Sequence, residues 1–183
     1  MDFLNSEIKN HVNVRHELIF SSDYKFPSVV NSFHDYALEK CPKDFNIIAE
    51  TKKNSGHGPT ILKGYKHYID NAKWIFQVDA DNEMSSKNFN LLWDKRDEFD
   101  FLIGSRDNRQ QPSSRKLVSL ISRMIINFFY GSSIKDVNSP YRLMKSLKFK
   151  RLFLQIPNNT FAPNLIISGY VSLSNLKYYQ VKI

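Results

Sequence analysis

The sequence predicts an α/β fold in which a largely parallel sheet carries helices on both faces. Short apolar runs of strand length alternate along the chain with segments whose apolar residues follow the helical period. Strands that alternate with helices form βαβ units, and the strands of such units run parallel. The 183 residues are 42% hydrophobic and 24% charged, as in globular rather than disordered chains, so residues 1–183 are expected to form a single domain.

The first half of the predicted fold contains two strands and two helices. Residues 17–20 form an apolar run typical of a buried strand, and residues 46–50 are typical of a second, short one. Between them, residues 27–40 predict a helix, with Pro27 in its first turn. Another helix is expected from Pro59, and its buried face would carry Ile61, Leu62, Tyr65, Tyr68 and Ile69.

The second half adds two strands and a strongly apolar helix. Residues 74–78 give the clearest strand, and residues 99–103 give another. The helix expected over residues 117–130 is apolar on too many sides for an ordinary surface helix, so we expect it to be buried in the protein or in an oligomer. The alternative is that it rests among lipid headgroups, with these basic residues facing the lipid phosphates: Arg115, Lys116 and Arg123.

The net charge of +8 favours anionic partners, namely nucleic acid, an anionic membrane surface or phosphorylated substrates. The cations are scattered and follow no nucleic-acid-binding signature, so nucleic acid is not expected. The start of the chain has no signal-peptide pattern, and no apolar run approaches the roughly 20 residues needed to span a bilayer. The lone cysteine, Cys41, fits a reducing compartment. The chain is expected in the cytoplasm, either soluble or peripheral on the cytoplasmic membrane face.

Asp79 and Asp81 follow the clearest predicted strand directly. Residues two apart on an extended backbone project to the same side, and two neighbouring carboxylates repel unless a cation or proton lies between them. Mg²⁺ and Mn²⁺ favour oxygen ligands, and Mg²⁺ commonly joins one or two carboxylates to substrate phosphates. The pattern therefore predicts a metal site. The alternative is a turn in which Asp81 or Asn82 caps a following helix.

Two further polar residues, Asp23 and Arg106, also follow predicted strands. Ligands of α/β sheets collect beyond the carboxyl ends of the strands, so both residues are expected at the same edge as the aspartates. The segment 54–58 leads into a helix, and its glycines would allow close approach of a phosphate or a sugar. The alternative is an ordinary strand-to-helix turn, in which His57 makes a hydrogen bond and is not a base.

Arginines near the predicted strand ends suit bidentate recognition of phosphate. Arg106 follows a strand, and Arg115 begins the next helix. Their alternative role is that of a solvated basic surface. Arg142 closes a polar cluster that precedes a further helix, where it either pairs with Asp136 or reaches an anionic substrate.

Taken in order, these segments resemble the family 2 glycosyltransferases, which have the GT-A fold. The subgroup that they resemble most is that of the dolichyl- and polyprenyl-phosphate mannose and glucose synthases. The resemblance begins at about residue 17 and covers most of the chain. The segments that carry it are Ser21-Ser22-Asp23, Asn54-Ser55-Gly56-His57-Gly58, Gln77-Val78-Asp79-Ala80-Asp81, Ile103-Gly104-Ser105-Arg106 and Asp136-Val137-Asn138-Ser139-Pro140-Tyr141-Arg142.

The resemblance assigns a role to each of these segments. Asp23 would contact the nucleoside, while Asp79 and Asp81 would hold Mg²⁺ or Mn²⁺ against the diphosphate of the sugar nucleotide. Arg106 and Arg115 would lie near the acceptor phosphate and act in catalysis with Asp81. Arg142 would also reach the acceptor phosphate. The residues expected to bind the UDP- or GDP-sugar are Asp23, Asn54, Gly56, Gly58, Asp79 and Asp81.

The reaction implied is transfer of a sugar to a polyprenyl phosphate in the synthesis of a cell-surface glycan or glycolipid. The alternatives are transfer to a saccharide hydroxyl, or a catalytically silent domain that acts as a binding or assembly partner. Relative to the family, the chain is expected to lack the first strand. Asn164 stands where many relatives have glutamate, which removes a candidate base; a phosphate acceptor, already an anion, needs no strong base.

Overall fold

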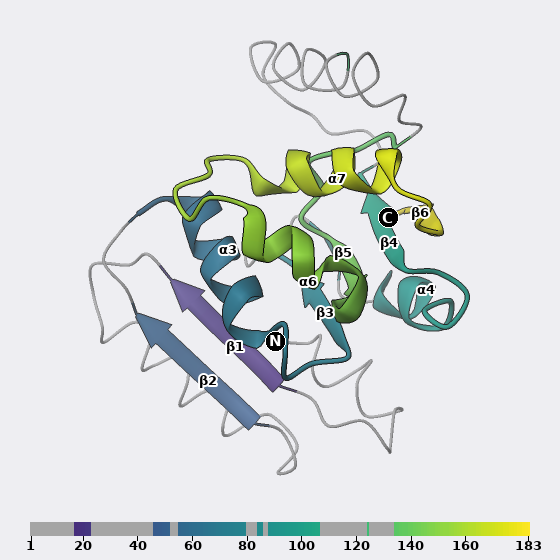
Figure 1. The fold of residues 1–183 in the computed structure, drawn as a ribbon. Helices are drawn as coiled ribbons and strands as arrows, with labels where there is room; N and C mark the ends of the chain where they lie inside the picture. The colour runs from purple at the N-terminus through teal and green to yellow at the C-terminus, as the bar shows by residue number, and fades with distance from the viewer. Residues whose placement is uncertain are drawn as a thin grey trace, which may run out of the picture.

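The computed structural model describes residues 17–22, 46–51, 55–79, 84–85, 88–106, 124 and 134–183. These residues form both strands and helices, and the helices flank a sheet, so the α/β class is confirmed (Figure 1). In chain order the elements are β1 (Glu17–Ser22), β2 (Asn46–Thr51), α3 (His57–Tyr68), β3 (Trp74–Gln77), α4 (Phe89–Trp93), β4 (Phe101–Ser105), β5 (Arg142–Lys145), α6 (Ser146–Gln155), α7 (Pro163–Leu173) and β6 (Tyr178–Lys182).

The larger sheet is mixed, so the prediction of a largely parallel sheet was wrong. Its strand order is β3-β5-β4-β6; β5 is antiparallel to both neighbours, and only β4 and β6 pair in parallel. The chain leaves β4 at Arg106 and re-enters β5 from the same edge, where Arg106 contacts Asp136, so β5 must run in the opposite direction. Strands β1 and β2 form a separate parallel pair, with β1 next to α3 (Figure 1).

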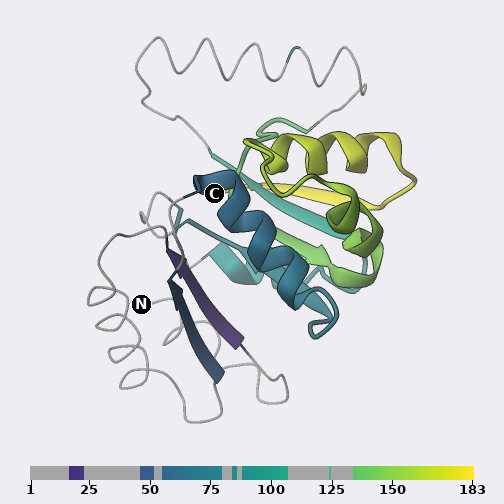
Figure 2. The same cartoon turned by 60° about the vertical axis from the view of Figure 1, so that its left-hand side comes forward.

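Helices cover both faces of the larger sheet, as predicted. Successive residues of a strand point to opposite faces, and in β4 Phe101 and Ile103 enter one apolar cluster while Leu102 enters the other. The first cluster includes residues of α3, α6 and α7, and the second includes residues of α4. Figure 2 shows the three longer helices together in front of the sheet. The sheet is therefore the middle layer of the described structure.

Helix α3 presents the buried face that the sequence predicts. Leu62, Tyr65, Tyr68 and Ile69 are buried, and Ile61, also predicted on this face, is partly buried. Tyr65 stacks on Phe153 of α6 with ring centroids 4.5 Å apart, which fixes α3 against the rest of the layer. Because the helix also begins beside the end of β3, its packing places the N-terminal end at the edge of the sheet where the predicted site lies.

Two helices predicted from the sequence fall outside the described residues. The helix over 27–40 is one, and the apolar helix over 117–130 is the other; of the latter only Met124 is described, and its side chain is exposed. Within the part of the chain that the structure describes, no helix combines the length and apolarity required to cross a bilayer.

Candidate functional site

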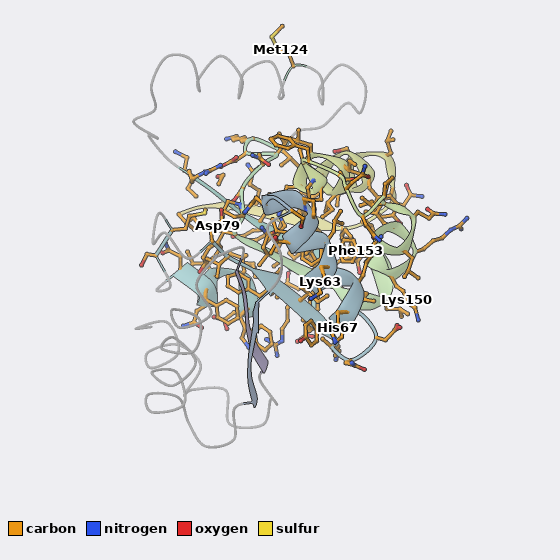
Figure 3. The ribbon with its side chains drawn as sticks, turned by 90° about the vertical axis from the view of Figure 1, so that its left-hand side faces the viewer. Lys63, His67, Asp79, Met124, Lys150 and Phe153 are labelled. Carbon is orange, nitrogen blue, oxygen red and sulfur yellow. The ribbon has the colours of Figure 1, made fainter. Side chains whose placement is uncertain are left out.

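Asp79 lies just beyond the C-terminal end of β3 and beside the start of α3. Its Oδ1 is 3.9 Å from Nε2 of His57, the first residue of α3. Figure 3 shows Asp79 toward the opposite end of α3 from His67. The N-terminal end of a helix carries a partial positive charge, which favours a carboxylate or a phosphate there. The structure therefore brings the glycine-containing segment close to Asp79, a contact that the sequence did not predict.

The sequence did not indicate that His57 lies next to Asp79. Its side chain is 65% exposed, against 34% for Asp79, so both can be reached from solvent. The sequence suggested a turn residue that makes a hydrogen bond. It did not indicate the contact with Asp79, because a whole helix and a strand separate the two residues along the chain. At 3.9 Å the interaction is a loose ion pair when the imidazole is protonated.

Gly56 and Gly58 each have a structural reason to be glycine. Gly56 precedes α3 with φ of 91°, a left-handed backbone that residues with a side chain rarely adopt. Gly58 is buried, and a Cβ there would collide with the backbone carbonyl oxygens of Thr160 and Phe161. This contact holds the start of α3 against the loop before α7. The predicted role of both glycines in nucleotide-sugar binding stays a prediction.

Arg106 directly follows β4, and Asp136 holds its guanidinium by both carboxylate oxygens. Nε donates to Oδ2 at 2.7 Å, and Nη2 donates to Oδ1 at 3.1 Å. The side chains are only 12% and 18% exposed, so water screens the pair weakly. A pair with Asp136 was one of two alternatives that the sequence left open for Arg142; in the structure the bidentate partner of Asp136 is Arg106.

Arg142 begins β5 and is fully buried. All three of its guanidinium nitrogens donate to backbone carbonyls: Nε to Ser139 at 2.8 Å, Nη1 to Asn164 at 3.3 Å and Nη2 to Val137 at 3.3 Å. Burial lowers the pKa of Arg142 to about 10, so the group remains charged at neutral pH. These contacts are structural ones, and the predicted contact with an acceptor phosphate stays a prediction.

A buried polar layer lies beneath Asp79, and the sequence did not indicate it. The phenol of Tyr65 donates to Oε1 of Gln77, which stands opposite Arg142 in the pairing of β3 with β5. Burial raises the pKa of Tyr65, which keeps the phenol protonated as a donor. Nε2 of Gln77 has no hydrogen-bond partner among the described residues. The signals in the sequence that could have revealed this layer are Gln77 within an apolar run and Arg142 at the end of a polar cluster.

The charges of the candidate site share one region. Arg142 interacts electrostatically with Asp136, Asp79 and Arg106. Strands β3 and β4 both run antiparallel to β5, so their C-terminal ends meet at the edge where β5 begins. Asp79 and Arg106 each follow one of these ends. The predicted convergence of a carboxylate and an arginine at one sheet edge is therefore observed for these two residues.

The remaining predicted site residues lie outside the described residues: Asp23, Asn54, Asp81 and Arg115. Among the residues that are described, no group of three or more histidine, cysteine or acidic side chains could hold a metal ion. Asp81, the second predicted ligand, is not among them, so the Mg²⁺ or Mn²⁺ site stays a prediction. Asp79 fits it in chemistry, because a half-exposed carboxylate can offer oxygen to a hard cation.

Comparisons with known proteins leave the family of the chain open. No protein-family model matches the chain, and no curated protein matches it significantly. What the site can do therefore rests on its own residues and on their arrangement at the edge of the sheet.

Proposed function

We propose that this protein transfers a sugar from a nucleoside-diphosphate sugar to a phosphate acceptor, with the help of a divalent cation. The observation that carries the proposal is the placement of Asp79 and Arg106 after the C-terminal ends of β3 and β4, at one sheet edge, where both interact electrostatically with the buried Arg142. Ligands of α/β sheets bind at such an edge. The α/β sheet with helices on both faces also supports the GT-A arrangement that the resemblance implies.

In this proposal Asp79 and Asp81 would hold the cation next to the diphosphate. The cation, when bound, stabilises the negative charge of the leaving nucleoside diphosphate. Asp79 is suited to the task because it is half-exposed and next to the positive end of α3. During transfer, the bond between the anomeric carbon and the diphosphate oxygen breaks, and an oxygen of the acceptor bonds to that carbon.

Arg106 supplies the positive charge on the acceptor side. A polyprenyl phosphate is already anionic, so it can attack without losing a proton to a base. This agrees with Asn164, which is buried beside Arg142 and has an amide that cannot accept a proton at neutral pH. An acceptor of this kind lies in a membrane, and the chain would therefore work at a membrane surface.

The Asp79→Asn variant tests the donor side of the proposal. Isothermal calorimetry with UDP- and GDP-sugars in Mn²⁺ should show affinity reduced by at least about tenfold, because the amide is a weaker ligand and carries no charge. The matched control is Asp97→Asn, which makes the same change at a side chain that is 72% exposed in the turn after α4. Equal affinity of Asp79→Asn and wild-type protein would show that the assignment is wrong.

A further inference from the structure

The bidentate pair of Arg106 and Asp136 joins two segments that are far apart in the sequence. Arg106 directly follows β4, while Asp136 lies in the loop that leads into β5. The backbone N–H of Arg106 also points to Asp136, with N to Oδ2 at 3.4 Å. A guanidinium bound by two parallel hydrogen bonds loses the freedom to rotate about its last torsion angles. The orientation of Arg106 is therefore set by Asp136.

The loop that carries Asp136 is itself held by hydrogen bonds from buried side chains. Arg142 donates to the carbonyls of Val137 and Ser139, and Ser168 of α7 donates to the carbonyl of Val137 at 2.7 Å. The backbone N–H of Ser139 closes a turn onto the carbonyl of Asp136 at 3.1 Å. Because Arg142 and Ser168 are fully buried, water does not compete for these bonds. The loop therefore presents Asp136 to Arg106 from a fixed position.

The charges explain why an aspartate is needed between the two arginines. The positive charge of Arg106 disfavours that of Arg142, and Asp136 favours it. Removal of the carboxylate would leave two guanidinium groups that repel each other in a poorly screened region.

We propose that Asp136 is the positioning residue for Arg106, and that the buried Arg142 acts on the acceptor only indirectly, by fixing the loop that holds Asp136. This rests on the proposed function in one respect, since the anion that Arg106 meets is taken to be the acceptor phosphate. The resemblance assigns Arg106, Arg115 and Arg142 to the acceptor, and the two of them that the structure describes have different tasks. Arg106 makes the contact, and Arg142 supports it from within the core.

The orientation of Arg106 can be tested without any substrate. In ¹⁵N-arginine-labelled protein, the Nε–H signal of Arg106, identified by its loss in Arg106→Lys, should be resolved and slow to exchange with water. In Asp136→Asn the signal should shift and exchange at least about tenfold faster, because a charged bidentate acceptor is lost. The control, Glu98→Gln, removes the same charge from an exposed pair with Lys95 and should leave the signal unchanged. An unchanged Arg106 signal in Asp136→Asn would overturn the proposal.

The consequence for the reaction can be tested with farnesyl phosphate as acceptor, UDP- or GDP-sugar as donor and Mn²⁺. Asp136→Asn should raise the KM for farnesyl phosphate by about 10- to 100-fold, because displacement of a group that orients the substrate has effects of this order. The KM for the donor should change less than about twofold. Asp136→Glu keeps the charge and one oxygen within reach, so it should restore part of the acceptor affinity and of the Nε–H signal. Equal changes in both KM values would indicate a merely structural role and overturn the proposal.

Two outcomes separate this proposal from the function on which it rests. If wild-type protein transfers no sugar, the proposed function fails, and the Nε–H experiment still decides whether Asp136 positions Arg106. If Asp136→Asn does not fold, as judged by circular dichroism, the Nε–H signal of Arg106 in wild-type protein decides the question. It should exchange slowly with water because Asp136 holds the guanidinium, and exchange as fast as that of the exposed Arg151 would refute the positioning role.

Discussion

Gly58 shows how a single residue ties the site to the rest of the molecule. It stands in the first turn of α3, next to the residue that approaches Asp79, and it packs against the backbone of the loop before α7. A side chain at this point would push α3 away from that loop. The position of the helix end beside Asp79 therefore depends on the absence of a side chain at residue 58.

The Gly58→Ala variant should lower the free energy of unfolding by about 1–3 kcal/mol, because the added methyl group collides with two carbonyl oxygens that belong to backbone and cannot turn aside. Gly64→Ala is the matched control in the same helix, since among the described residues an added Cβ would meet no heavy atom within 4 Å other than those of its chain neighbours and the helix backbone. It should raise the free energy by about 0.5–1 kcal/mol through helix propensity. Urea denaturation followed by circular dichroism measures both, and equal effects would contradict this account of Gly58.

At the scale of elements, β5 organises the site. It is inserted between β3 and β4 and runs against both, so the loop before it arrives at their C-terminal ends. Arg142, its first residue, holds that loop by donating hydrogen bonds to the backbone carbonyls of Ser139 and Val137. The antiparallel strand thus places Asp136 beside Arg106, which a parallel strand in the same position would not do.

The Arg142→Met variant should be destabilised by roughly 3 kcal/mol or more, because buried carbonyls lose a charged donor. Arg142→Lys should recover only a small part of this, since an ammonium group cannot reproduce the planar set of donors. The exposed Arg151→Met on α6 is the control, and it should change the unfolding free energy by less than about 0.5 kcal/mol. A similar small effect of Arg142→Met in urea denaturation would show that the loop is held by other contacts.

At the scale of the whole molecule, the sequence predicted the layers better than the connections between them. The apolar runs at 74–78 and 99–103 correspond to β3 and β4 with small shifts, and the buried face of α3 was recognised from its period. The direction of β5 was not predicted. Its four residues begin with an arginine and follow a polar cluster, so no apolar run marks the strand. A short strand of this kind is defined by the neighbours with which it pairs.

The candidate site was predictable only in part, because it too depends on how neighbouring elements pair and pack. Strand ends identify Asp79 and Arg106, because side chains at strand ends collect at one edge of a sheet. The partners of these residues come from other elements: His57 from the start of α3 and Asp136 from the loop before β5. Such contacts depend on how the elements pack, and sequence spacing carries little information about that.

We propose that the sheet edge around Asp79 and Arg106 transfers a sugar from a nucleotide to a phosphate. The most direct measurement is mass spectrometry of the products formed from UDP- and GDP-hexoses, Mn²⁺ and farnesyl phosphate. We predict a farnesyl phosphohexose that is formed by wild-type protein, is reduced strongly in Asp79→Asn, and is absent when the metal is chelated. Product formation that is unchanged in Asp79→Asn and after chelation, or no product from folded wild-type protein with any of these donors, would contradict the claim.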